Sequence, residues 1–186
     1  SLLELLRIPY TGSRVLTNAI ALDKTLTKRI WRDRRLPVAP FQEFYTGDEP
    51  LRPELRYPLF VKPANLGSSV GISKVRAYAE TAPALAKAFR YDRKVLAEQG
   101  IIGREIECSV LGNEEPRASL PGEVIPFREF YDYRDKYLEG RTQFRIPAEL
   151  PGRKIKEIQR LAVEAYKAVE CSGLARLDFF LEEKTG

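Results

Sequence analysis

An amphipathic helix followed at once by an apolar strand is the feature that most restricts the fold of this chain. Between residues 153 and 170 the apolar side chains recur three or four positions apart and form one stripe, made of Ile155, Ile158, Leu161, Ala162, Ala165, Tyr166 and Val169. The apolar segment "GLARLDFFLEE" comes directly after it and is typical of a strand. The pair predicts a protein that combines helices with a sheet.

Shorter elements precede this pair. Residues 14–35 predict a helix with a break near Asp23, carrying apolar residues such as Leu16 and Leu22 at helical spacing. A second helix is predicted at "AETAPALAKAFRY", with Thr81 as its N-cap. The segments with strand character are "YPLFVKP", "VGISKV", "KVLAEQ", "REIECSVLG" and "GEVIP". Short strands mixed with separate helices indicate an α+β fold with mostly antiparallel sheets.

Composition excludes several classes of function. The chain has no histidine, which rules out histidine-based nucleophiles, bases and metal ligands within these residues. No apolar run approaches the length of a bilayer span. Cys108 and Cys171 lie far apart in the sequence and predict reduced thiols in a cytoplasmic protein. The net charge of +5 comes from basic residues scattered among acidic ones, so we expect a mixed surface with sites for an anionic ligand and no nucleic-acid partner.

The segment "KPANLGSSVGISK" places Lys62 before a loop of small residues that contains Gly67, Ser68, Ser69 and Gly71. Glycine adopts positive φ readily and allows backbone N–H groups to approach a ligand closely. A lysine that leads into such a loop suggests a phosphate site, although the order differs from the Walker pattern, in which the lysine ends the loop. The alternative is a surface hairpin with an exposed lysine.

Two pairs of charged residues are candidates for a site. Glu98 and Glu105 flank the bend "EQGIIGRE" and are either solvated or suited to accept hydrogen bonds from an adenine amino group and ribose hydroxyls. Arg176 and Asp178 lie two positions apart in a strand and therefore share one face. They either form a self-contained salt bridge or hold a cation and an anionic substrate side by side.

Residues 127–142, "FREFYDYRDKYLEGRT", have five aromatic residues and no clean periodicity. The pattern favours a long ordered loop, and loops of this size in compact domains are usually functional.

Five motifs resemble, in order, those of the D-alanine–D-alanine ligase family of ATP-grasp enzymes. They are "ALDKTLTK", "FVKPANLGSSVGISKV", "KVLAEQGIIGREIE", "EFYDYRDKYL" and "GLARLDFF". The resemblance covers essentially the whole chain and implies an ATP-grasp fold with a central domain and an incomplete C-terminal domain. It implies a remnant of the N-terminal domain at residues 1–16, the central domain at 17–104 and the C-terminal domain at 105–186.

The resemblance also implies a nucleotide site, formed by Lys24, Lys62, Ser68, Ser69, Glu98, Gln99, Ile101, Glu105 and Lys136. Lys24 and Lys62 would hold ATP phosphates under the loop that contains Ser68. Glu98 and the backbone from Gln99 to Ile101 would receive adenine, and Glu105 would bind the ribose.

The family resemblance assigns the remaining roles to later residues. Lys136 and Tyr137 would lie on a loop that covers the site, with Tyr137 hydrogen-bonded to Ser68. Arg176 would stabilise charge on the acyl phosphate and the tetrahedral intermediate, and Asp178 would ligate Mg²⁺ or Mn²⁺. A lid is expected because an acyl phosphate hydrolyses when water enters.

The implied reaction is the ATP-dependent joining of two D-alanine molecules for peptidoglycan precursor synthesis, by a cytoplasmic homodimer that does not act on membranes. One alternative is a ligase that makes D-alanyl-D-lactate or D-alanyl-D-serine on the same fold. Another is a non-catalytic nucleotide-binding module. The chain has no methionine and ends after "LDFFLEEKTG", so we expect a piece of a longer enzyme that is inactive alone.

Overall fold

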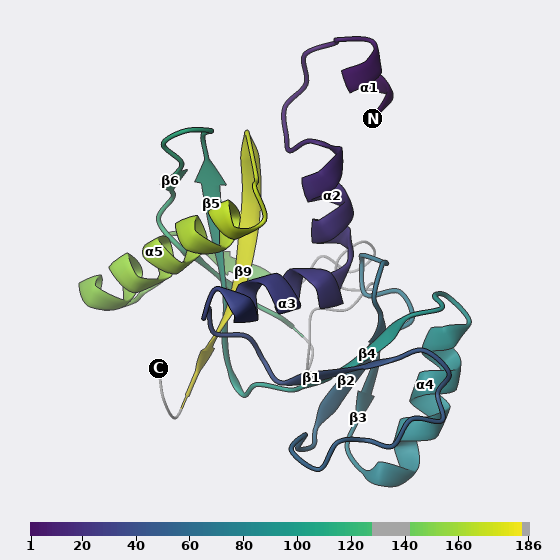
Figure 1. Ribbon diagram of the computed structural model, residues 1–186. Helices are drawn as coiled ribbons and strands as arrows, with labels where there is room; N and C mark the ends of the chain where they lie inside the picture. The colour runs from purple at the N-terminus through teal and green to yellow at the C-terminus, as the bar shows by residue number, and fades with distance from the viewer. Residues whose placement is uncertain (128–141, 184–186) are drawn as a thin grey trace.

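Two antiparallel sheets with a helix between them organise the chain in the computed structural model, which describes residues 1–127 and 142–183 (Figure 1). The first sheet has the strand order β1-β4-β2-β3. Its strands are β1 (Phe41–Phe44), β2 (Leu59–Pro63), β3 (Ser73–Val75) and β4 (Val95–Gln99). The structure thus confirms the predicted α+β class with antiparallel pairing.

The second sheet is centred on β5 (Gly103–Leu111), which pairs along its whole length with β9 (Leu174–Glu182). On its other side β5 pairs with β6 (Arg117–Ala118) and β7 (Gly122–Ile125), and β7 pairs with β8 (Gln143–Arg145). The alternation predicted for β5 is confirmed, because Ile106, Cys108 and Val110 are buried. The first sheet therefore occupies residues 41–99 and the second residues 103–182, while a domain boundary at 104/105 stays a prediction.

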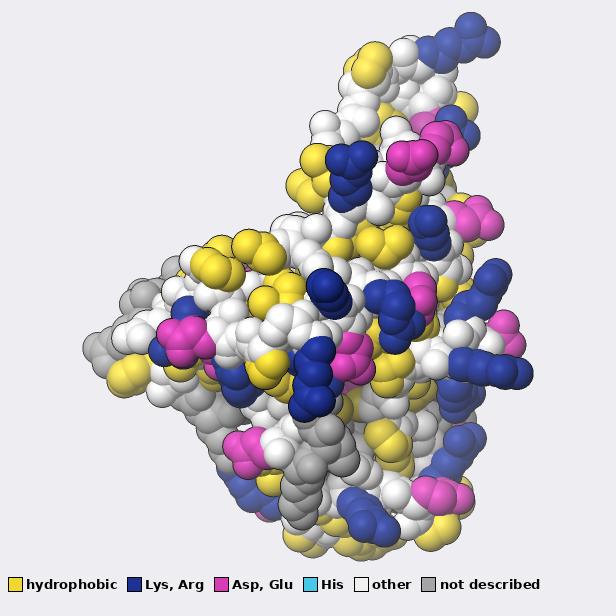
Figure 2. Space-filling view, turned by 90° about the vertical axis from the view of Figure 1, so that its left-hand side faces the viewer, with side chains coloured by type: hydrophobic (Ala, Val, Ile, Leu, Met, Phe, Trp, Pro, Cys, Tyr) yellow, Lys and Arg dark blue, Asp and Glu magenta, His cyan; other side chains and the backbone are white. Residues whose placement is uncertain are grey.

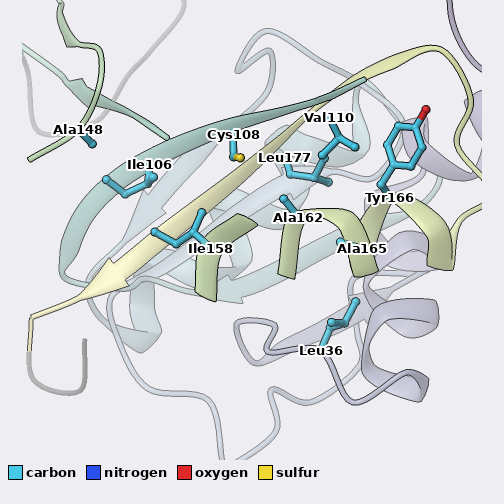
Figure 3. Close-up of a cluster of buried hydrophobic side chains, with 10 residues drawn as sticks. All are labelled: Leu36, Ile106, Cys108, Val110, Ala148, Ile158, Ala162, Ala165, Tyr166 and Leu177. Carbon is cyan, nitrogen blue, oxygen red and sulfur yellow. The ribbon is translucent and has the colours of Figure 1, made fainter. Parts of the chain in front are cut away.

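Each sheet has a hydrophobic core under its own helix. Helix α4 (Thr81–Phe89) covers the first sheet, where Leu59, Val61 and Val95 are buried with Leu85. Helix α5 (Gly152–Ala168) covers the second sheet, and Figure 3 shows its Ile158, Ala162 and Tyr166 facing β5 and β9. The apolar stripe predicted between residues 153 and 170 is thereby confirmed as the core face of α5.

Helix α3 (Lys24–Asp33) lies between the two sheets (Figure 1). The predicted break at Asp23 is real: its carboxylate accepts hydrogen bonds from the backbone N–H groups of Thr25 and Leu26, both at 3.1 Å. The same carboxylate pairs with Lys94, just before β4. At the other end, the indole N–H of Trp31 donates to the carbonyl of Ala165 in α5 at 3.0 Å. Helix α3 is thus fixed to the first sheet at one end and to helix α5 at the other.

The N-terminal segment consists of α1 (Leu2–Leu5) and α2 (Val15–Leu22), and it extends away from the sheets (Figure 1). Leu16 and Leu22 are exposed, whereas the buried residue of α2 is Thr17, whose hydroxyl donates to the carbonyl of Glu170 at 2.8 Å. The apolar positions of this helix therefore do not mark its buried face in the described structure.

Two local predictions were wrong. Thr81 is the first residue of α4 and not its cap, because the 3₁₀ turn Tyr78–Glu80 before it already gives Thr81 helical dihedral angles. An N-cap residue needs a non-helical conformation. The predicted strand "VGISKV" is shorter than expected, since β3 starts only at Ser73 and Gly71 before it has φ = +74°.

Candidate functional site

The candidate site begins on the face of the first sheet that points away from α4. Residues of β2 alternate, so Leu59 and Val61 are buried under the helix while Phe60 and Lys62 lie on the opposite face. The register of β2 and β4 places Phe60 opposite Glu98. Glu98 therefore shares its face with Lys62, although 36 residues separate them in the sequence.

Glu98 is held by two lysines. Its Oε1 pairs with Lys28 of α3 and its Oε2 with Lys62 of β2, and only 13% of its side chain is exposed. Burial raises the pKa of Glu98, but the charges of Lys62 and Lys28 outweigh it and lower the pKa from 4.5 to about 2. Glu98 is therefore a fixed, ionised hydrogen-bond acceptor. The alternative left open by the sequence, a solvated Glu98, does not apply.

Lys24 lies beside this group at the start of α3. Its Nζ donates to the carbonyl oxygens of Pro63 at 3.1 Å and Ala64 at 3.2 Å, and also to that of Leu66. Burial and the positive charge of Lys62 lower the pKa of Lys24 from 10.5 to about 8. Lys24 is thus a cation that organises the first residues of the small-residue loop.

The loop from Ala64 to Ile72 has an unusual backbone conformation. Ser68 and Ser69 have φ of +53° and +59°, and neither is a glycine. The base of the loop is fixed by Asp92, whose carboxylate accepts from both the backbone N–H and the side-chain amide of Asn65, at 2.8 and 2.9 Å. Left-handed backbone at non-glycine residues clusters at ligand sites, which favours the phosphate interpretation over a plain surface hairpin.

The segment predicted to receive a purine follows Glu98 directly. Gln99 is anchored, since its side-chain oxygen accepts from the backbone N–H of Arg56 at 3.1 Å. The N–H of Gly100 donates to the carbonyl of Pro58 at 2.8 Å, and a Cβ at Gly100 would lie 3.1 Å from that oxygen and from Phe60. Ile101 and Glu105 are half-buried. The segment from Glu98 to Ile101 therefore connects the first sheet to strand β5, which carries Glu105.

Arg176 and Asp178 form the second predicted group and lie on β9, facing away from the core. The guanidinium donates two hydrogen bonds to the carboxylate, at 2.7 and 3.0 Å, and pairs with Glu107 of β5 at 3.2 Å. Leu177 between them is buried. The shared face is confirmed. Arg176 and Asp178 pair with each other, but the salt bridge is not self-contained, because Arg176 also pairs with Glu107.

No group of three or more acidic, cysteine or histidine side chains suited to a metal ion occurs among residues 1–127 and 142–183. Both oxygens of Asp178 face Arg176, and one carboxylate does not provide the near-octahedral oxygen set that Mg²⁺ prefers. The described residues therefore do not fit a complete magnesium site.

Lys136 and Tyr137 lie outside the described residues, as does most of the loop predicted at 127–142.

Sequence reasoning missed Lys28. A signal for it existed, because Lys28 follows Lys24 by four positions and residues with that spacing share a helix face. We refer to Lys24, Lys28, Lys62 and Glu98 together as the lysine cluster.

The surface supports the expectation of mixed charge. On the face shown in Figure 2, lysines and arginines are interspersed with acidic and hydrophobic side chains and form no continuous cationic stripe. A hollow of about 650 Å³ lies elsewhere, between the N-terminal segment and the turn before β9, where Tyr10, Arg14 and Gly173 line it. We place the site at the lysine cluster because the charged groups converge there.

Within the described chain, no helix is long and apolar enough to cross a membrane.

Comparisons with known proteins support the resemblance. The family described as "D-ala D-ala ligase C-terminus" matches residues 30–186. D-alanine–D-alanine ligase of Solibacter usitatus is 52% identical over 187 residues, which cover 99% of this chain and 58% of the relative. The enzyme of Thermoanaerobacter sp. is 50% identical over 193 residues, covering all of this chain and 54% of the relative. The chain thus spans little more than half the length of these relatives.

Solved structures give the same result. The D-alanine–D-alanine ligase of Coxiella burnetii has a TM-score of 0.84 and 38% identity, covering all of this chain and 50% of that one. The VanG D-Ala:D-Ser ligase of Enterococcus faecalis has a TM-score of 0.87 and 34% identity, covering 97% of this chain and 54% of that one. The matched family sequence includes the last residues of α3, both sheets and two of the four residues of the lysine cluster, Lys62 and Glu98. This chain belongs to the D-alanine–D-alanine ligase family, whose C-terminal region it matches.

Proposed function

We propose that this chain forms the ATP-binding part of a D-alanine–D-alanine ligase. The observation that carries the proposal is the lysine cluster beside a loop with left-handed backbone, in a chain 52% identical to a ligase of that name. In the proposed reaction, ATP phosphorylates the carboxylate of one D-alanine. The amine of a second D-alanine then displaces phosphate, and a D-alanyl-D-alanine dipeptide forms.

The lysine cluster would bind the phosphates and the adenine. Phosphoryl transfer depends mainly on positioning and on neutralising charge, which Lys24 and Lys62 can do at the base of the loop. Ser68, Ser69 and neighbouring backbone amides would cover the phosphates. Glu98 would accept a hydrogen bond from the adenine amino group, next to backbone groups of Gln99 and Ile101.

The remaining roles concern the ribose and the reacting groups. Glu105 would bind the ribose hydroxyls. Arg176, which pairs with Asp178 and Glu107 in the structure, would stabilise negative charge on the acyl phosphate and the tetrahedral intermediate. Lys136 and Tyr137 would belong to the lid, with Tyr137 bonded to Ser68.

Asp178 is our candidate for one ligand of Mg²⁺ or Mn²⁺. A divalent ion would neutralise phosphate charge when bound. Because the described residues supply no complete donor set, we assign no step of the reaction to the ion.

A hybrid enzyme tests the proposed activity. Residues 1–186 would replace the matching segment of the Solibacter usitatus ligase, whose sequence aligns over 99% of this chain. We expect phosphate release that requires both ATP and D-alanine. A folded hybrid that binds ATP without D-alanine-dependent turnover would instead support the non-catalytic nucleotide-binding module.

The acceptor is D-alanine in our proposal, because both curated relatives described above carry that name at about 50% identity. The D-Ala:D-Ser ligase with a similar structure is 34% identical, so D-serine is a second candidate acceptor. Product analysis of the hybrid with D-alanine, D-serine and D-lactate in competition decides between them. Dominant D-alanyl-D-serine or D-alanyl-D-lactate would contradict the proposal.

We further propose a homodimer that works in the cytoplasm. Both cysteines are free thiols, in keeping with a reducing compartment. Light scattering on the purified protein at several concentrations measures the assembly, and a monomer throughout would contradict the dimer.

A further inference from the structure

Lys28 belongs to the lysine cluster, but none of the contacts to ATP proposed above is assigned to it, although in the described structure it makes one of the two ion pairs of Glu98. Its Nζ contacts Oε1, and only 15% of its side chain is exposed. The ammonium group also lies 5.7 Å from the centre of the Phe41 ring, and the register of β1 and β4 places Phe41 directly opposite Glu98. Lys28 is therefore held between an aromatic ring and the carboxylate, a position suited to a fixed structural cation.

Lys62 faces two demands that conflict. In the structure it pairs with Oε2 of Glu98, while the proposed function asks it to neutralise a phosphate. If Lys62 turns toward a phosphate, Glu98 loses one of its two partners. A buried carboxylate left without a partner is strongly destabilised. A second cation on the other oxygen removes this difficulty, and Lys28 is in that place.

We propose that Lys28 is a positioning residue that holds Glu98 in place when Lys62 moves to the nucleotide phosphates. With Oε1 bound by Lys28, Oε2 becomes the atom that accepts the exocyclic amino group of adenine. The choice of adenine over a purine with a carbonyl at that position then depends on Lys28, although Lys28 does not touch the base. This inference rests on the proposed ATP site and extends it to base selection.

Calorimetric titration of the chain with Mg-ATP and with Mg-ITP tests the inference, because inosine has a carbonyl where adenine has its amino group. We expect the wild type to favour ATP. Lys28→Met keeps the length of the side chain without the charge and is expected to lower ATP affinity by about tenfold or more, with little effect on ITP. Lys28→Arg restores the cation and is expected to recover most of the preference for ATP.

Arg32→Met is the matched control. Arg32 lies one turn further along α3 and contacts the same ring, at 5.6 Å from its centre, but it is exposed and has no ion pair with Glu98 in the described structure. We expect both nucleotides to bind this variant as they bind the wild type. Equal losses in Arg32→Met and Lys28→Met would show a general charge effect and overturn the inference.

The remaining outcomes separate the two levels of the proposal. Absence of ATP binding by the folded wild-type chain overturns the ATP site and the role of Lys28 together. ATP binding by the wild type with an unchanged ATP-to-ITP ratio in Lys28→Met overturns only the role of Lys28. Circular dichroism checks that each variant is folded. If Lys28→Met is not, Lys28→Gln takes its place, because it keeps a hydrogen-bond donor to Glu98 without the charge, and the same ratio is decisive.

Discussion

Replacing Glu98 by glutamine probes the electrostatics of the lysine cluster without changing its shape. The pKa of Glu98 is lowered from 4.5 to about 2, and each pKa unit corresponds to about 1.4 kcal/mol. The folded state therefore favours the ionised form by about 3 kcal/mol. A second figure, which does not use the pKa, agrees with this one: removing one partner of a buried ion pair typically costs about 3–5 kcal/mol of stability. We expect Glu98→Gln to lower the free energy of unfolding at pH 7 by about 3 kcal/mol.

Urea denaturation followed by circular dichroism measures this loss, and its pH dependence gives a second check. Because the folded pKa is depressed, the stabilisation by Glu98 is fully present above pH 4.5 and is lost as the pH falls through about 2. The difference between wild type and variant should shrink over that interval. As a control, Glu164→Gln removes an exposed pair with Arg160, which is worth about 0.5 kcal/mol. A loss in Glu98→Gln no larger than in this control would refute the reasoning.

Three further predictions concern single residues. Nucleotide affinity should fall as the pH rises through about 8, where Lys24 loses its charge, and Lys24→Arg should remove that inflection in calorimetric titrations. Gly71→Ala should destabilise the fold by about 1–3 kcal/mol in urea denaturation, since φ is +74° and a Cβ would lie 2.9 Å from Pro63 and Tyr91; an unchanged midpoint would contradict this. Tyr166→Phe should lower the free energy of unfolding by about 1–2 kcal/mol in the same assay, because the buried hydroxyl donates its proton to the carbonyl of Gly112 at 2.7 Å, with that of Gly173 at 3.3 Å; a loss below about 0.5 kcal/mol would count against that bond.

Elements with strong local periodicity were predictable from the sequence. Helix α5, strand β5 and strand β9 each carry enough regularly spaced apolar residues to determine their type and buried face. The break near Asp23 was also predicted, and the structure supplies its cause, since the Asp23 side chain caps the helix that follows. By contrast, β1 was missed, because its four residues, Phe41–Phe44, form too short a segment to show a period.

The partners of the site residues were harder to predict. Alternation alone placed Arg176 and Asp178 on one face, but it left open whether they pair with each other. The contacts of Glu98 with Lys28 and Lys62 depend on strand register and on the position of α3, which is set by packing between residues distant in the sequence. No local pattern encodes such long-range geometry.

The most direct test of the ATP site is the titration of Mg-ATP into the chain and into Lys62→Met. We expect Lys62→Met to weaken ATP binding by about tenfold or more, because a charge-assisted contact to phosphate is lost while Lys28 still holds Glu98. Lys167→Met, the same change at an exposed position of α5, should bind ATP like the wild type. Equal ATP affinity in Lys62→Met and the wild type would contradict the assignment of the lysine cluster as the phosphate site.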